Sequence, residues 1–256
     1  MRTQLVIFDL DGTLIDSAPE IADAVNEVLR TERLPECPLA EIRALIGEGA
    51  RTTVARAYAQ SQRRARGETG AAAGTDPDPD PGCAVLPDRT LLDRLMSTYA
   101  QSILASSGRR STIYPHVHTA LDYLRNTGVQ TALVTNKEER FALPLLTALG
   151  LRGFAPIVCG DTLPTRKPHP APILRCLAHH DVAPEHALVI GDSELDVIAA
   201  RAAGVRSLLV AWGYGSLERS DPASRLNSFA ELPREIESAR SIDTSVPTHW
   251  SPIWAD

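Results

Sequence analysis

Hydrophobic residues gather in short continuous runs along the chain, and each run stops at small, polar or acidic residues. The first run covers residues 5–8 and stops at Asp9. Later runs of the same form cover 129–134, 157–159, 187–190 and 207–211. Short continuous hydrophobic runs are typical of strands buried on both faces of a parallel sheet. The pattern therefore predicts one parallel sheet built from these segments.

Segments with hydrophobic residues at helical spacing separate the predicted strands. They cover 116–126, 139–149, 170–179 and 194–203. Strands that alternate with helices favour a Rossmann-like α/β fold, with helices on both faces of a parallel sheet. Ligands of such sheets bind beyond the carboxyl ends of the strands. The polar residues that end the hydrophobic runs therefore mark the expected site.

Residues 17–106 have a different pattern, with helical spacing and no predicted strand. The amphipathic segments there are 21–29, 39–46, 52–58 and 91–104. We interpret this region as a small all-helical cap domain inserted after the first strand. The predicted organisation is an α/β core domain of 1–16 and 107–237, a cap of 17–106, and a polar tail of 238–256.

Two segments are expected to lack regular structure. Residues 62–82 contain alternating aspartate and proline at 76–81, and proline disfavours both helix and sheet hydrogen bonding, so a mobile loop is predicted. The spacing of these aspartates does not match a calcium-binding loop. The tail contains Trp250 and Trp254, which are expected to pack on the protein's own surface.

Composition narrows the class of protein. The formal net charge is −6 with both signs mixed along the chain, which disfavours a nucleic-acid binder. No hydrophobic stretch approaches the roughly 20 residues that span a bilayer, and no targeting pattern is found at the N-terminus. The cysteines are far apart, without metal-ligand spacing: Cys37, Cys83, Cys159 and Cys176. We expect reduced thiols and a cytoplasmic protein.

Asp9 and Asp11 stand two residues apart where the first predicted strand ends, so both side chains can face the same side. Paired carboxylates repel each other unless a cation binds or one of them is protonated. Two roles fit this pair. Asp9 is the candidate nucleophile and metal ligand, and Asp11 is the candidate general acid and base.

Four short motifs follow one another at predicted strand ends and loops: Phe8–Leu14, Val134–Asn136, Arg166–Pro170 and Gly191–Asp196. With these motifs in this order, the chain resembles the haloacid dehalogenase superfamily. The resemblance implies a magnesium-dependent hydrolase of phosphate monoesters that acts through an aspartyl-phosphate intermediate at Asp9.

The resemblance also assigns roles to individual residues. It implies that Thr135, Asn136 and Lys167 bind the substrate, with Thr135 and Lys167 counted as catalytic. Mg²⁺ prefers oxygen ligands and retains several waters.

The predicted metal ligands are Asp9, Asp192 and, through its backbone carbonyl, Asp11. Asp196 is expected to support the site from behind by holding Lys167 or a metal-bound water.

A narrower resemblance concerns the substrate. Residues 159–172, with 46–50, 135–137 and 212–214, look like the corresponding segments of bacterial phosphoglycolate phosphatases. The chain departs from that pattern at His116, where glycine is usual, and at Glu138, where proline is common. This resemblance implies hydrolysis of 2-phosphoglycolate, with a small phosphorylated metabolite as the only predicted partner.

Arg51 follows the glycine-containing segment 46–50 in the predicted cap. It is a candidate partner for the substrate carboxylate. The alternative is an ordinary turn between helices followed by a surface arginine.

Other functions stay open at this point. A sugar- or amino-sugar-phosphate phosphatase and a phosphosugar mutase would use the same motifs, and a catalytically silent binding module could retain the fold. Haloacid dehalogenation is disfavoured because Asp11 suits an alkoxide leaving group. The sequence gives no information on oligomeric state.

Overall fold

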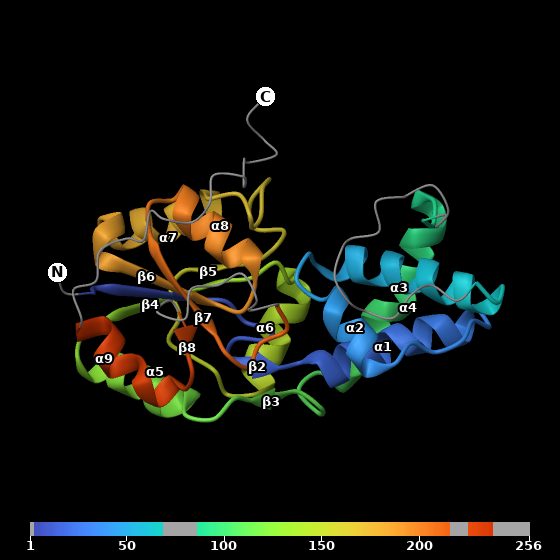
Figure 1. Cartoon of the computed structure of the whole chain (residues 1–256), viewed down its shortest axis with the longest axis horizontal. Helices are drawn as coiled ribbons and strands as arrows, with labels where there is room; N and C mark the ends of the chain where they lie inside the picture. The colour runs from blue at the N-terminus through green and yellow to red at the C-terminus, as the bar shows by residue number, and fades with distance from the viewer. Residues whose placement is uncertain (1–2, 69–85, 216–224, 238–256) are drawn as a thin grey trace.

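The computed structural model describes residues 3–68, 86–215 and 225–237, which form two lobes (Figure 1). One lobe contains a sheet with helices on both faces. The other lobe consists of the helices formed by residues 18–65 and 89–106.

A parallel sheet forms the centre of the first lobe. In spatial order, its described strands are β5 (Ile157–Val158), β4 (Gln130–Val134), β1 (Leu5–Phe8), β6 (Ala187–Gly191), β7 (Arg206–Val210) and β8 (Arg225–Leu226). Phe8 at the end of β1 lies opposite Leu133 of β4 and Ile190 of β6. The carboxyl ends of these three strands therefore lie side by side, which brings together the residues that follow them.

Helices cover both faces of this sheet because β1 presents apolar side chains on alternate faces. Val6 and Phe8 pack in one cluster and Leu5 and Ile7 in another, and all four are fully buried. The first cluster includes side chains of α5 (Val117–Asn126), α6 (Glu139–Ala148) and α9 (Leu232–Glu237). The second includes side chains of α7 (Ala171–His180) and α8 (Glu194–Ala202). The 3-10 helices η1 (Pro184–His186) and η3 (Phe229–Glu231) lead into β6 and α9.

The helical lobe, which we call the cap, has a core of its own. Its helices are α1 (Ala18–Thr31), α2 (Leu39–Leu45), α3 (Ala50–Ala65) and α4 (Arg89–Ser106). Val25, Ile42, Val54 and Leu95 are buried between them. Phe141 of α6 joins this cluster. The cap therefore packs on the core lobe through α6.

A second, two-stranded sheet forms where the chain passes between the lobes. In it, β2 (Ile15–Asp16) pairs antiparallel with β3 (Thr112–Ile113). This sheet fixes both connecting segments beside the end of β1.

The predicted α/β class with a parallel sheet is confirmed, and the differences from the predicted elements are local. The predicted loop from residue 62 begins too early, because α3 continues to Ala65, and the remainder of that segment up to 82 is almost entirely outside the described residues. The short strand β8 was not predicted, since two residues are too few to show a pattern. The tail with Trp250 and Trp254 is also outside the described residues. Within the described ranges, no helix is both long and apolar enough to cross a membrane.

Candidate active site

Asp9 lies directly beyond β1, where its backbone N–H donates a hydrogen bond to the carbonyl of Ile190 at 2.9 Å. The next residues turn sharply. Gly12 adopts a φ of +85°, and an added Cβ there would overlap with the carboxylate of Asp192. Only glycine fits both requirements, which explains the glycine of the first motif.

Three carboxylates from different elements converge beyond the sheet. Asp9 follows β1, Asp192 follows β6 and Asp196 lies in the first turn of α8; one oxygen of each lies within 4.8 Å of the others. All three side chains are buried. Burial raises the pKa of Asp9 to about 7, although the nearby Lys167 opposes this shift. Burial, followed by the charges of Asp9 and Asp196, raises the pKa of Asp192 well above its usual value.

Lys167 neutralises part of this cluster. Its Nζ donates to Asp9 Oδ1 at 2.6 Å, to Asp196 Oδ1 at 2.6 Å and to the carbonyl of Val134 at 2.9 Å. An ammonium group has three donors, so this set uses all of them. Burial lowers the pKa of Lys167, but the two carboxylates outweigh burial and raise it. Lys167 is therefore a fixed positive charge beside Asp9.

Asp196 is held on both of its oxygens. Oδ2 accepts from the backbone N–H and the hydroxyl of Ser193, in a capping box at the start of α8. Since Oδ1 is bonded to Lys167, Asp196 positions the lysine and the loop that carries Asp192.

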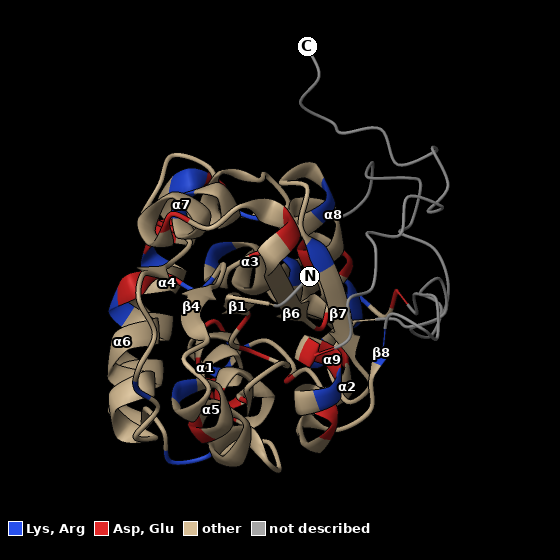
Figure 2. Cartoon of the chain, turned by 90° about the vertical axis from the view of Figure 1, so that its left-hand side faces the viewer, with Lys and Arg blue, Asp and Glu red and all other residues tan. Residues whose placement is uncertain are grey.

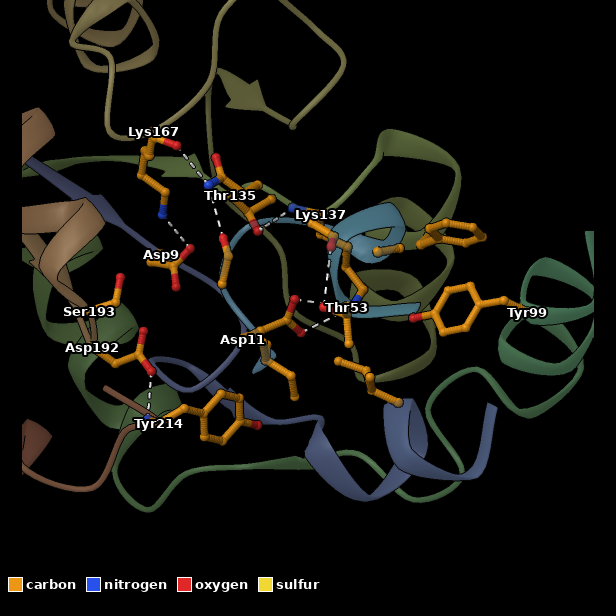
Figure 3. Close-up of a pocket in the computed structure, with 17 residues that line it drawn as sticks. Asp9, Asp11, Thr53, Tyr99, Thr135, Lys137, Lys167, Asp192, Ser193 and Tyr214 are labelled. Carbon is orange, nitrogen blue, oxygen red and sulfur yellow. Dashed lines mark hydrogen bonds and ion pairs between the residues drawn. The ribbon is translucent and has the colours of Figure 1, made fainter. Parts of the chain in front are cut away.

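The loop after β7 wraps around Asp192. The backbone N–H of Tyr214 donates to Asp192 Oδ2 at 2.7 Å, as Figure 3 shows. A Cβ on Gly213 would overlap with Asp192, and a Cβ on Gly215 would overlap with its carbonyl. This close approach orients the Asp192 carboxylate toward Asp9.

Asp11 points away from the three carboxylates, toward the cap (Figure 3). Its Oδ1 accepts from the hydroxyl of Ser17 at 2.5 Å, and both oxygens lie 3.1 Å from Lys137 Nζ. The structure therefore separates the side chain of Asp11 from the acidic cluster. Its predicted part in metal binding rests on its backbone carbonyl alone.

Thr135 and Asn136 follow β4 and line the same cavity. The hydroxyl of Thr135 accepts from the backbone N–H of Lys137 at 3.2 Å, which leaves its proton available to a ligand. Asn136 Nδ2 donates to the carbonyls of Gly47 in the cap and Lys167 in the core, both at 2.9 Å. Asn136 thus links the cap to the loop of Lys167.

The cavity lies between the lobes. Its core wall includes Asp9, Asp11, Thr135, Asn136, Lys167 and Asp192. Its cap wall includes Gly47, Gly49, Thr53 and Tyr99. The structure thus brings together every predicted site residue except Arg51; Asp196 does not line the cavity but bonds Lys167 and lies beside Asp9 and Asp192. Arg51 does not line the cavity, because its guanidinium pairs with Asp93 at 2.8 Å on the exposed face of the cap.

The residues of the site that were not predicted from the sequence include Ser17, Lys137 and Tyr214, which bond Asp11 or Asp192. Lys137 and Tyr214 belong to segments noted for their resemblance, but nothing in the sequence assigned a function to their side chains. The signal that could have found Lys137 is its position directly after two predicted substrate-binding residues at a strand end. Ser17 and Tyr214 gave no such signal.

The charges at the site match a divalent cation. Four carboxylates, Asp9, Asp11, Asp192 and Asp196, face two ammonium groups, Lys137 and Lys167, which leaves an excess of two negative charges among these residues. Burial is the main cause of the raised pKa values of Asp9 and Asp192, and the neighbouring carboxylates add to it. A hard cation that prefers carboxylate oxygens fits this donor set.

Comparison with known proteins defines the class of this fold and site. Residues 6–210 match the model of the haloacid dehalogenase-like hydrolase family, so the chain belongs to that family. It is a phosphoric monoester hydrolase, as the sequence motifs predicted.

The chain is similar to several named phosphatases. It is 40% identical to phosphoglycolate phosphatase 1 of Pseudomonas aeruginosa over 82% of this chain and 70% of that protein. It is 32% identical to the phosphoglycolate phosphatase of Nitrosococcus oceani over 93% of this chain and 98% of that protein. A crystal structure described as a predicted phosphoglycolate phosphatase from Haemophilus somnus has a TM-score of 0.80 and 28% identity, covering 92% of this chain and 98% of that one.

Proposed function

We propose that this protein hydrolyses 2-phosphoglycolate to glycolate and inorganic phosphate, with Mg²⁺ bound and through an aspartyl-phosphate at Asp9. The observation that supports this most is the convergence of Asp9, Lys167 and Asp192 from three separate motifs on one cavity. The similarity to phosphatases named for phosphoglycolate supports the substrate.

Asp9 is the proposed nucleophile. Lys167 occupies Oδ1, which leaves Oδ2 without a hydrogen-bond partner among the described residues. Oδ2 attacks the phosphorus, the bond from phosphorus to the ester oxygen breaks, and the phosphoryl group becomes attached to Asp9. Lys167 and the hydroxyl of Thr135 then lie where they can stabilise the negative charge of the transferring group.

Asp11 is the proposed general acid and base. In its protonated form it donates a proton to the ester oxygen as glycolate leaves. It then accepts a proton from the water that attacks the phosphorus of the aspartyl-phosphate. Phosphate leaves, and the Asp9 carboxylate is restored. Because Asp11 faces the cap, the leaving group is expected on that side of the cavity.

Asp9, Asp192 and the backbone carbonyl of Asp11 would hold the metal ion, with Tyr214 orienting Asp192 through its backbone N–H. A bound Mg²⁺ would reduce the repulsion between the Asp9 carboxylate and the anionic phosphoryl group. Mg²⁺ and a small phosphorylated metabolite are thus the proposed ligands. The cytoplasmic location stays a prediction.

A panel of phosphate monoesters, assayed for phosphate release with and without EDTA, tests the proposal. We expect 2-phosphoglycolate to have the highest kcat/KM and EDTA to stop turnover. A higher kcat/KM for a sugar or amino-sugar phosphate would reject the substrate. Phosphoryl transfer to added sugar phosphate without phosphate release would identify a mutase, and no turnover of any ester would identify a binding module.

A further inference from the structure

Lys137 occupies an unusual place in the cavity. Its side chain is only 6% exposed, and Nζ contacts both oxygens of Asp11 at 3.1 Å. Its backbone is fixed, because its N–H donates to Thr135 and its carbonyl accepts from Gly160 at 2.9 Å. The ammonium group is thereby held inside the cavity on the side that faces Thr53 and Tyr99 of the cap (Figure 3).

Lys137 is the cation that can accept a second anion. The described residues that line the cavity include two cations, Lys137 and Lys167. All three donors of Lys167 are used by Asp9, Asp196 and the Val134 carbonyl. Among the described residues, Lys137 Nζ donates to the two oxygens of Asp11. Because an ammonium group has three donors, at least one remains for a ligand.

The position of Lys137 matches the leaving group rather than the phosphoryl group. The phosphoryl group is attacked at Asp9, and Asp11 serves the ester oxygen. In 2-phosphoglycolate one methylene group separates that oxygen from the carboxylate, so the carboxylate must lie close to the partners of Asp11. Lys137 is such a partner, whereas Arg51 is bound to Asp93 outside the cavity.

We propose that Lys137 forms the subsite for a carboxylate on the leaving group and so makes the enzyme selective for acidic phosphate monoesters. This inference rests on the proposed function and adds the residue that recognises the substrate. The cap closes the subsite from the opposite side with Thr53 and Tyr99. Burial raises the pKa of the Tyr99 hydroxyl, which keeps it a neutral donor facing the same space.

The test compares two substrates that differ only at this group: 2-phosphoglycolate and 2-hydroxyethyl phosphate, in which a hydroxymethyl group replaces the carboxylate. The wild-type protein, Lys137→Met and Lys137→Arg are assayed for kcat/KM with Mg²⁺. The ratio of the two kcat/KM values is the readout, because any effect on Asp11 changes both substrates equally and cancels.

We expect the wild type to favour 2-phosphoglycolate and Lys137→Met to reduce that preference about 100-fold, as loss of a buried charge-assisted hydrogen bond predicts. Lys137→Arg should retain part of the preference, since it keeps the charge. Arg51→Met is the matched control and should leave the ratio unchanged.

Three results would overturn the subsite: an unchanged ratio in Lys137→Met, equal use of both substrates by the wild type, or a changed ratio in Arg51→Met. Failure of the proposed substrate looks different. Another carboxylated monoester could have a higher kcat/KM than 2-phosphoglycolate, which would reject the proposed substrate. If Lys137→Met then removes the preference for that monoester over the analogue without its carboxylate, the subsite is supported all the same.

Discussion

Burial and the nearby lysine have opposite effects on the pKa of Asp9. A nucleophilic carboxylate must be ionised, yet burial raises its pKa to about 7, and Asp192 and Asp196 lie close by. Lys167 opposes this rise through a hydrogen bond of 2.6 Å. At the scale of single residues, the site therefore depends on Lys167 to keep Asp9 ionised when no metal is bound.

Lys167→Met is expected to destabilise the fold. Removing the ammonium group leaves Asp9 and Asp196 buried without their cation, and breaking a buried ion pair in this way costs about 3 to 5 kcal/mol. Urea unfolding in EDTA measures the change in the free energy of unfolding. Arg125→Met, which removes an exposed pair with Asp122, is the control and should change it by less than about 1 kcal/mol. Equal losses in both variants would contradict this account of Lys167.

At the scale of elements, the loop after β7 connects the candidate metal site to the first cap helix. The Tyr214 backbone holds Asp192, while its hydroxyl oxygen accepts from the N–H groups of Ser17 and Ala18 at 2.8 and 3.0 Å and donates to Asp16 at 2.8 Å. Ser17 precedes α1 but makes no side-chain cap. The Tyr214 hydroxyl therefore satisfies two backbone N–H groups at the start of α1, those of Ser17 and Ala18.

Tyr214→Phe removes these three hydrogen bonds without changing the backbone bond to Asp192. We expect the free energy of unfolding to fall by about 1 to 2 kcal/mol. Tyr123→Phe is the matched control, because its hydroxyl donates to the exposed Glu237, and it should cost less than about 0.5 kcal/mol. Thermal unfolding of both variants measures this difference, and a loss for Tyr214→Phe no larger than that for Tyr123→Phe would contradict this role of the Tyr214 hydroxyl.

The sequence best predicted those site residues whose position is determined by the end of a strand. Asp9, Thr135 and Asp192 directly follow strands of one parallel sheet, so their convergence follows from the fold. Arg51 shows the limit of this reasoning. A residue in the first turn of a helix can point to either side, and this one points to Asp93 on the outer face.

Lys137 and Tyr214 were not assigned from the sequence for a related reason. Their partners, Asp11 and residues 16–18, are distant in sequence, so the contacts follow from the folded arrangement of the chain and not from a local pattern. The linker sheet of β2 and β3 was missed because each strand has only two residues.

At the scale of the whole molecule, the distribution of charge is uneven. Ion pairs lie on exposed surfaces of the cap, as for Arg56 with Glu48, while the acidic residues of the site lie buried between the lobes. In Figure 2, acidic and basic residues are mixed over the side of the core lobe that faces the viewer. An anionic substrate is thus attracted only by the local cations and a bound metal.

The chemical reactivity of the Cys176 thiol can show whether the core lobe is folded. Cys176 is fully buried, and burial raises the pKa of its thiol to about 12. At pH 8 the thiolate fraction is therefore on the order of 10⁻⁴, and it increases as the pH rises toward the pKa. We expect iodoacetamide to modify Cys176 in urea-unfolded protein but not in folded protein, as peptide mass spectrometry can measure. Rapid modification of Cys176 in the folded state would contradict its burial.

The most direct test of the central claim is chemical identification of the phosphorylated residue. The protein is mixed with Mg²⁺ and its best substrate carrying a ³²P-labelled phosphoryl group, quenched in acid within one turnover, and digested for peptide mapping. We expect a hydroxylamine-labile phosphate on the peptide that contains Asp9, and none in Asp9→Asn or when EDTA is present. A label on any other residue, or turnover that persists in Asp9→Asn free of deamidation, would contradict the proposed nucleophile.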